Sequence, residues 1–274
     1  MAERVTRCRA LLGTFVEVTA DSGQAIEHAF DTVARVDRLM SAHEPGSDVA
    51  SINRFSHLHP VEVDQWTALV LERALFWARE SGGAFDAVRA GKASLERGLL
   101  PIHDDQPRPE ASHWTWLEIQ GRSVQWMKPG CVDLGGIAKG FAADRAIEAL
   151  RTAGAECGLV NAGGDLRGFG SQSWPVTIVD PLSRRPLAAV ELCDGALATS
   201  ALLDGQSVHL PGRDGRFVSA SVRAPSAMDA DALTKVVLSG SLHSAQCLAI
   251  VGAEGFRILH DGSVEAVEME AADA

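Results

Sequence analysis

Two glycine pairs, each placed where a short apolar segment ends, constrain the fold of this chain more than any other feature. Gly135-Gly136 follows a segment that we expect to be a short strand ending at Asp133, and it opens an expected helix that ends near Ala153. Gly163-Gly164 follows a second expected strand, Cys157–Val160. Glycine permits tight turns and close approach of a ligand to the backbone. The pattern therefore predicts strands and a helix whose connecting loops could meet at one site.

The rest of the chain mixes both kinds of periodicity. Apolar residues three and four apart after Ser22, a possible N-cap, predict a helix to Met40. Further helices are expected through residues 66–74 and, as the last one, at 228–238. Strands are expected at residues 11–20, 116–119, 124–127, 176–179, 188–193 and 217–222, with a hairpin at 261–262. Residues 43–60 are expected to be a loop, and 81–110 loops with short helical pieces. No repeat or linker is visible, so we expect one α+β domain over residues 1–274, with a frayed acidic tail from about 265.

Composition narrows the function classes. A formal net charge of −11 argues against a nucleic-acid-binding surface, which needs a basic stripe. The five cysteines are scattered and odd in number, which is typical of a reducing compartment. The N-terminus lacks the apolar core of a signal peptide, and no segment approaches the roughly 18 apolar residues of a membrane span. These features predict a cytoplasmic protein without membrane insertion.

The segment from Asp133 to Gly140 is a candidate anion site. The N-terminus of a helix presents free N–H groups to an anion, and Lys139 one turn later adds a positive charge. The alternative is a tight turn with a solvated lysine, since the spacing matches neither of the common phosphate-binding glycine motifs. Likewise Asp165, after the second glycine pair, could bind exposed amides or merely close a turn.

A third candidate lies at the start of the last expected helix. Asp231 and Thr234 are three residues apart, so both side-chain oxygens can share one helical face. A carboxylate with a hydroxyl is a partial shell for Mg²⁺, which keeps several waters and borrows oxygens from phosphates. The alternative is helix capping, by Ser226 or Asp229.

Taken together and in order, these segments resemble the ApbE family, the FAD:protein FMN transferases, over nearly the whole chain. The block DLGGIAKGFAADRA at residues 133–146 is highly specific. The other matching segments are Gly13-Thr14-Phe15, Met40-Ser41, Ser47 to Asn53, Gly83-Ala84-Phe85-Asp86, VNAGGDLRGFG at 160–170, GALATS at 195–200 and SAMDADAL at 226–233.

The resemblance implies an ApbE-like domain with a mostly antiparallel sheet and flanking helices. It implies an enzyme that binds FAD and Mg²⁺ and transfers FMN to a threonine or serine hydroxyl of a flavoprotein, releasing AMP. The flavin dinucleotide would contact residues at the positions Ala84, Phe85, Asp86, Asp133 and Lys139. The metal would be held by the main-chain oxygen of Gly136, by Asp231, and by oxygens one helical turn beyond it. Mn²⁺ prefers similar oxygen ligands, so the choice between Mg²⁺ and Mn²⁺ stays open.

Three departures from the family pattern bear on this expectation. The family commonly has threonine four residues after the metal-binding aspartate, whereas this chain has Lys235 there, with Thr234 beside it. A protonated lysine cannot bind Mg²⁺, so either Thr234 substitutes or the metal is held more weakly. The segment containing the expected base, His209, is shortened. His43 stands where a flavin-stacking aromatic residue is expected.

Two other functions therefore stay open beside the transferase. The protein could be a pyrophosphatase that hydrolyses FAD to FMN and AMP without an acceptor. It could also be an FAD-binding protein that has lost catalysis, which the changes at Lys235 and around His209 would permit. The sequence does not identify the acceptor protein or the oligomeric state.

Overall fold

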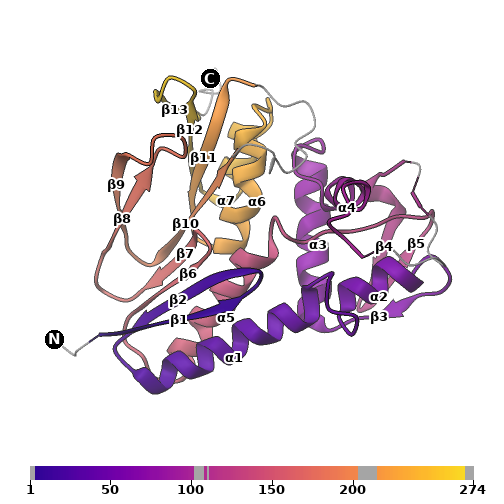
Figure 1. The fold of residues 1–274 in the computed structure, drawn as a ribbon, viewed down its shortest axis with the longest axis horizontal. Coiled ribbons are helices and arrows are strands. Elements are labelled where there is room, and N and C mark those ends of the chain that lie inside the picture. Colours follow the sequence, from indigo (N-terminus) through magenta and orange to yellow (C-terminus); the bar gives the residue numbers. More distant parts are fainter. Residues whose placement is uncertain (1–3, 102–107, 110, 203–214, 269–274) are drawn as a thin grey trace.

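A large antiparallel sheet forms the frame of the molecule (Figure 1). The computed structural model describes residues 4–101, 108–109, 111–202 and 215–268. The eight strands of this sheet follow the order β1-β2-β6-β7-β10-β11-β12-β13. Their bounds are β1 (Val5–Leu11), β2 (Thr14–Ala20), β6 (Gly158–Ala162), β7 (Asp165–Phe169), β10 (Gly195–Ala201), β11 (Phe217–Ala224), β12 (Glu254–Leu259) and β13 (Val264–Ala266).

Helices cover one face of this sheet and a hairpin covers the other. Alternate residues of a strand point to opposite faces, and β10 illustrates this. Ala196 and Ala198 pack in the main core with α5 (Ala138–Thr152) and α6 (Ala227–Leu238). Leu197 packs in a second cluster with Trp174 and Leu192, from the two strands β8 (Trp174–Val179) and β9 (Pro186–Leu192). Since both faces of the sheet are covered, its central strands, such as β10, are held in a fixed position.

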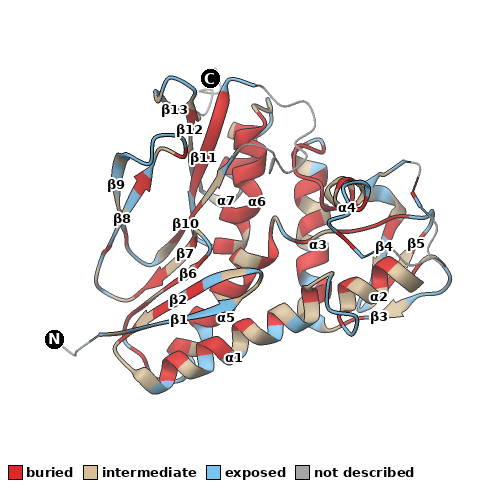
Figure 2. Ribbon diagram, viewed as in Figure 1, coloured by how far each residue is buried: buried red, intermediate tan, exposed pale blue. Residues whose placement is uncertain are grey.

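A second group of elements lies beside the large sheet (Figure 1). Its three-stranded sheet has the order β3-β5-β4. The strands are β3 (Val61–Glu62), β4 (Leu117–Gln120) and β5 (Ser123–Trp126), after the short 3₁₀ helix η1 (Trp114–Trp116). The helices are α2 (Asp48–Phe55), α3 (Gln65–Glu80) and α4 (Ala87–Glu96). One continuous apolar core joins both groups, along α1 (Gly23–Met40), α5 and α6 (Figure 2).

Many predicted elements are confirmed, and the predicted α+β class with a mostly antiparallel sheet is correct. Ser22 caps α1 by accepting a hydrogen bond from the Ala25 amide at 3.3 Å. Ser226 caps α6 in the same way, whereas Asp229 binds Arg73 and Trp77 of α3. No helix in the described parts of the chain is long and apolar enough to cross a membrane.

Four expectations are wrong. Residues 11–20 are not one strand, because Leu12 and Gly13 have positive φ angles and form the two-residue turn between β1 and β2. The expected loop at 43–60 contains α2, which Ser47 caps. The helix at 228–238 is not the last, because α7 (Ser244–Val251) follows it. The segment ending at Asp133 is not a strand, since its main chain bonds to the side chain of Asn53 instead of a neighbouring strand.

Candidate functional site

A cavity of about 330 Å³ lies where the two groups of elements meet. Its walls come from α4 and the loops on either side of it, from the N-terminus of α5, from β10 and from α6. The cavity is lined by Ala84, Phe85, Asp86, Ala87, Ala90, Ser94, Arg97, Leu99, Asp133, Gly135, Gly136, Lys139, Ser200 and Lys235. Six expected site residues (Ala84, Phe85, Asp86, Asp133, Gly136 and Lys139) are therefore brought together.

The first turn of α5 faces this cavity. Its N-cap residue, Ile137, provides no side-chain hydrogen bond, and the Gly140 amide in this turn donates to the Asp231 carboxylate instead. The preceding turn is held by Asp133, which accepts from the Gly135 amide at 2.8 Å and from the Ser94 hydroxyl at 2.8 Å. A rigid helix N-terminus with Lys139 beside it is a favourable place for an anion.

On the opposite wall, Asp86 fixes the loop that contains Phe85. Its carboxylate caps α4 by accepting from the amides of Val88 at 2.9 Å and Arg89 at 3.1 Å. Burial raises the pKa of Asp86, while these two amides and the Arg89 guanidinium act in the opposite direction. The Phe85 amide in turn donates to the Ser81 hydroxyl at 3.0 Å. Phe85 is thus held in a fixed position, where it is 5% exposed and forms part of the cavity lining.

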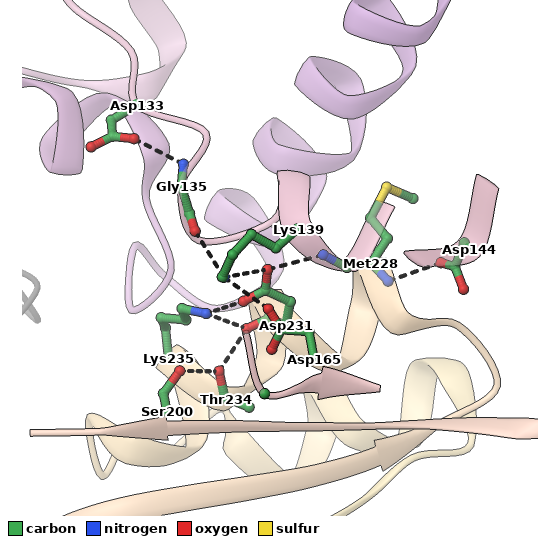
Figure 3. A network of polar contacts seen from close by, with 12 residues as sticks. Asp133, Gly135, Lys139, Asp144, Asp165, Ser200, Met228, Asp231, Thr234 and Lys235 are labelled. Carbon is green, nitrogen blue, oxygen red and sulfur yellow. Dashed lines mark hydrogen bonds and ion pairs between the residues drawn. The ribbon is translucent and has the colours of Figure 1, made fainter. Parts of the chain in front are cut away.

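Below the first turn of α5 lies a cluster of two carboxylates and two ammonium groups (Figure 3). Lys139 Nζ lies 2.8 Å from Asp165 Oδ2 in an ion pair and 3.4 Å from Asp231 Oδ2, and it also donates to the Gly135 carbonyl at 3.3 Å. Lys235 Nζ donates to Asp231 Oδ1, and to the main-chain oxygen of Asp231 at 2.9 Å. The cluster therefore joins α5, β7 and α6.

The charges in this cluster depend on one another. Burial by itself would lower the pKa of Lys139, but the carboxylates of Asp231 and Asp165 reverse this and raise it. Burial and the charge of Asp231 raise the pKa of Asp165 to about 6, although Lys139 and Lys235 oppose the rise. Burial works against the Asp231 carboxylate too, yet Lys139 and Lys235 outweigh it and lower the pKa of Asp231. Asp231 is therefore the firmly ionised member of the carboxylate pair.

Contacts between α5 and α6 bring Asp231 to this position. The carboxylate of Asp144 on α5 accepts from the amides of Ala227 and Met228 at 2.9 Å each, at the N-terminus of α6. Gly140 makes the close crossing possible, because a Cβ there would collide with the main-chain oxygen of Ala227. The Gly140 amide then donates to Asp231 Oδ2 at 3.3 Å.

Of the expected metal ligands, Gly136 lines the cavity, but Asp231 and Thr234 do not fit a magnesium ion in this arrangement. Both carboxylate oxygens of Asp231 and its main-chain oxygen already accept from N–H or O–H donors. The Thr234 hydroxyl donates to the Asp231 main-chain oxygen at 2.6 Å and lies 2.7 Å from Ser200 Oγ (Figure 3). Within the described ranges no group of three or more His, Cys, Asp or Glu side chains could hold a metal ion.

Of the two histidines expected at the site, His43 lies within the described residues and His209 does not. His43 is exposed and lines a neighbouring cavity of about 510 Å³, which shares Ser94, Asp133 and Lys139 with the first. A ligand longer than one cavity could therefore reach His43. His209 lies outside the described residues.

Sequence reasoning misses Ser200 altogether, and for Asp165 and Lys235 it misses the partners with which they form ion pairs. Asp165 was considered as a partner for main-chain amides, but it pairs with Lys139, while the Asn161 side chain binds the Gly164 amide at 2.9 Å. Ser200 ends the GALATS segment, and its position in that segment was the available signal. Lys235 departs from the family pattern, and the structure shows that its partner is Asp231.

Comparison with known proteins decides the family. The ApbE family model matches residues 12–251. The chain belongs to the ApbE family. The matched range contains every element around the cavity and both members of the buried carboxylate pair.

Individual relatives agree with this assignment. The chain is 28% identical over 278 residues to an FAD:protein FMN transferase of Treponema pallidum, covering 83% of this chain and 76% of the relative. An ApbE protein of Thermotoga maritima has a similar structure, with a TM-score of 0.83, 25% identity and coverage of 97% of both chains. The flavin transferase ApbE of Vibrio cholerae has the same fold, with a TM-score of 0.82, 22% identity and coverage of 98% of both chains. The chain is thus a homologue of FAD:protein FMN transferases over most of its length.

Proposed function

We propose that this ApbE-family protein transfers FMN from FAD to a threonine or serine hydroxyl of a flavoprotein and releases AMP. The observation that supports this most directly is the cavity at the N-terminus of α5. It combines a helix end and Lys139, which suit a diphosphate, with the apolar surface of Phe85, which suits an isoalloxazine ring. The two kinds of surface match the two ends of an FMN group.

In this reaction the acceptor oxygen forms a bond to the FMN phosphorus, and the bond from that phosphorus to the bridging oxygen breaks. AMP leaves with the bridging oxygen. Lys139 and the positive end of the α5 dipole would stabilise the negative charge that builds on the phosphoryl oxygens, as fixed positive groups do in phosphoryl transfer. Asp165 and Asp231 would hold the Lys139 ammonium group in place.

A base must accept the proton of the attacking hydroxyl. His209 fills this role in the proposal, because its position in the order of the family's segments matches that of the expected histidine. Mg²⁺, which the resemblance implies, has no role in this step, because Asp231 and Thr234 are already bonded to other groups of the chain. The acceptor would be a cytoplasmic or cytoplasm-facing flavoprotein.

Product analysis tests this proposal. The protein is incubated with FAD, with and without a candidate acceptor, and AMP and free FMN are quantified. AMP that appears only with the acceptor, without matching free FMN, supports transfer. AMP and free FMN in equal amounts without an acceptor would instead identify a pyrophosphatase. FAD binding with no AMP under either condition would identify an inactive binder, and both results would overturn the proposal.

A further inference from the structure

We propose that the ammonium group of Lys235 occupies the position of a divalent metal ion on Asp231, so that the protein binds the diphosphate of its ligand without a divalent cation. This inference rests on the proposed function, since it concerns the binding of the same dinucleotide.

The first support is the way in which Lys235 binds Asp231. The two residues are four apart on α6, and the lysine side chain runs back toward the helix N-terminus. Its Nζ donates both to Oδ1 and to the main-chain oxygen of Asp231, so two oxygens of one residue share a single cation. A metal ion that uses the Asp231 carboxylate would need these oxygens.

The second support is the balance of charge in the cluster. Asp165 and Asp231 together bring two negative charges in a region where their side chains are 4% and 0% exposed. Lys139 and Lys235 bring two positive charges. A divalent ion added to these four groups would be repelled by both ammonium groups, and no further carboxylate would balance its charge. If the ion replaced the Lys235 ammonium group instead, it would bind a buried carboxylate that needs a cation.

The third support is the fixed position of the Lys235 side chain at the cavity. Only 10% of that side chain is exposed. A Cβ added to Gly136 would lie 3.3 Å from Lys235 Cε and 3.5 Å from the Phe85 ring, so the lysine stem lies close to the main chain of Gly136. A lysine has three N–H donors. Among the described residues, Lys235 Nζ donates to two oxygens of Asp231, which leaves the third N–H for a phosphate oxygen in the cavity that Lys235 lines.

The wild-type protein gives the first test. FAD affinity is measured by flavin fluorescence in a metal chelator and again with millimolar Mg²⁺. We expect the two dissociation constants to agree within about threefold, because the charge on the diphosphate is met by groups of the chain in both conditions. FAD binding that needs Mg²⁺ would overturn the inference and leave the proposed function standing. Absence of FAD binding in both conditions would contradict the proposed function itself.

Substitutions at Lys235 give the second test. Lys235→Thr provides an oxygen in place of the ammonium group, so in chelator it should bind FAD about tenfold or more weakly, and Mg²⁺ should restore binding. Mg²⁺ alone should raise the melting temperature of Lys235→Thr but not of the wild type, because an ion that binds only the folded state stabilises it. Lys235→Met, which offers no oxygen, should lose affinity without rescue.

Lys128→Thr is the matched control, because it removes the same charge from an exposed lysine that does not line the cavity. It should behave like the wild type in both media. Equal FAD affinity of Lys235→Thr and wild type in chelator would overturn the inference. If Lys235→Thr does not fold, the FAD affinities of the wild type in chelator and with Mg²⁺ test the inference on their own.

Discussion

The side-chain amide of Asn53 binds both main-chain groups of Val132, with Nδ2 donating to the carbonyl at 2.9 Å and Oδ1 accepting from the amide at 2.8 Å. The two residues are buried and 79 positions apart in the chain. The amide thus replaces the neighbouring strand that this extended segment lacks. The segment continues directly into Asp133 and the first turn of α5, so α2 positions one wall of the site.

Asn53→Ala should therefore weaken both the fold and the site. It leaves a buried N–H and a buried C=O unbonded, which should cost about 2–4 kcal/mol of unfolding free energy. FAD affinity should fall as well, because the turn at Asp133 is less well held. Urea unfolding and flavin fluorescence measure the two effects. An Asn53→Ala protein with unchanged stability would contradict the structural role given to this amide.

Lys139 is expected to provide charge for the diphosphate. To bind a phosphate oxygen, the Lys139 ammonium group would exchange its long contact with the Gly135 carbonyl, at 3.3 Å. Lys139→Ala should then weaken FAD binding by about 1.5–3 kcal/mol, the range for a lost charge-assisted hydrogen bond. Lys128→Ala, which removes an exposed lysine, should leave the affinity unchanged. Titration of both variants with FAD measures the difference. Equal affinities would remove Lys139 from the binding site.

His209 is expected to be the base. His209→Ala should slow FMN transfer by a factor of about 10²–10⁴, the usual contribution of a general base, while FAD binding stays nearly the same. Single-turnover AMP release and FAD titration separate the two effects. If transfer persists within a factor of a few, another group accepts the proton, and Asp231 becomes the first candidate.

Asp165 should make stability depend on pH. The pKa of Asp165 is raised from 3.8 to about 6 by burial and by the charge of Asp231. Between these values the folded chain holds a proton that the unfolded chain has released. The contribution of Asp165 to stability is thus complete below pH 3.8 and is lost as the pH rises through about 6.

Asp165→Asn removes this titration. The unfolding free energy of the variant, relative to that of the wild type, should therefore rise between pH 4 and pH 6 by at most about 1.4 kcal/mol per pH unit. Urea unfolding of both proteins across that range measures the slope. A difference that does not vary with pH would contradict the raised pKa.

Strong local signals allowed part of the fold to be predicted. α1 combines an apolar face with a capping serine, so the sequence correctly predicts that the helix begins directly after Ser22. β1 was missed because it is an edge strand with five consecutive exposed residues, which have no inward-outward alternation. α2 was missed because only eight residues in a polar stretch form it.

At the site, the order of the family's segments predicted residues that line the cavity, but it did not predict the ion pairs beside it. Phe85 and Lys139 belong to segments with recognisable spacing, and both line the cavity. The contact of Lys139 with Asp165 and Asp231 joins three separate elements and depends on the crossing of α5 and α6. No local pattern encodes that crossing. Lys235 and Asp231 are one helical turn apart, so their pairing is local. The effect of this pairing on ligand binding depends on the burial of both side chains beside the cavity.

Intact-mass measurement of an acceptor flavoprotein tests the central claim most directly. The acceptor is incubated with this protein and FAD, denatured to remove unbound flavin, and then weighed and mapped by peptide fragmentation. We expect the acceptor mass to rise by one FMN group, on a threonine or serine, with one AMP released per group attached. An unchanged mass for acceptors that carry a free target hydroxyl, under conditions in which FAD is bound, would contradict the account.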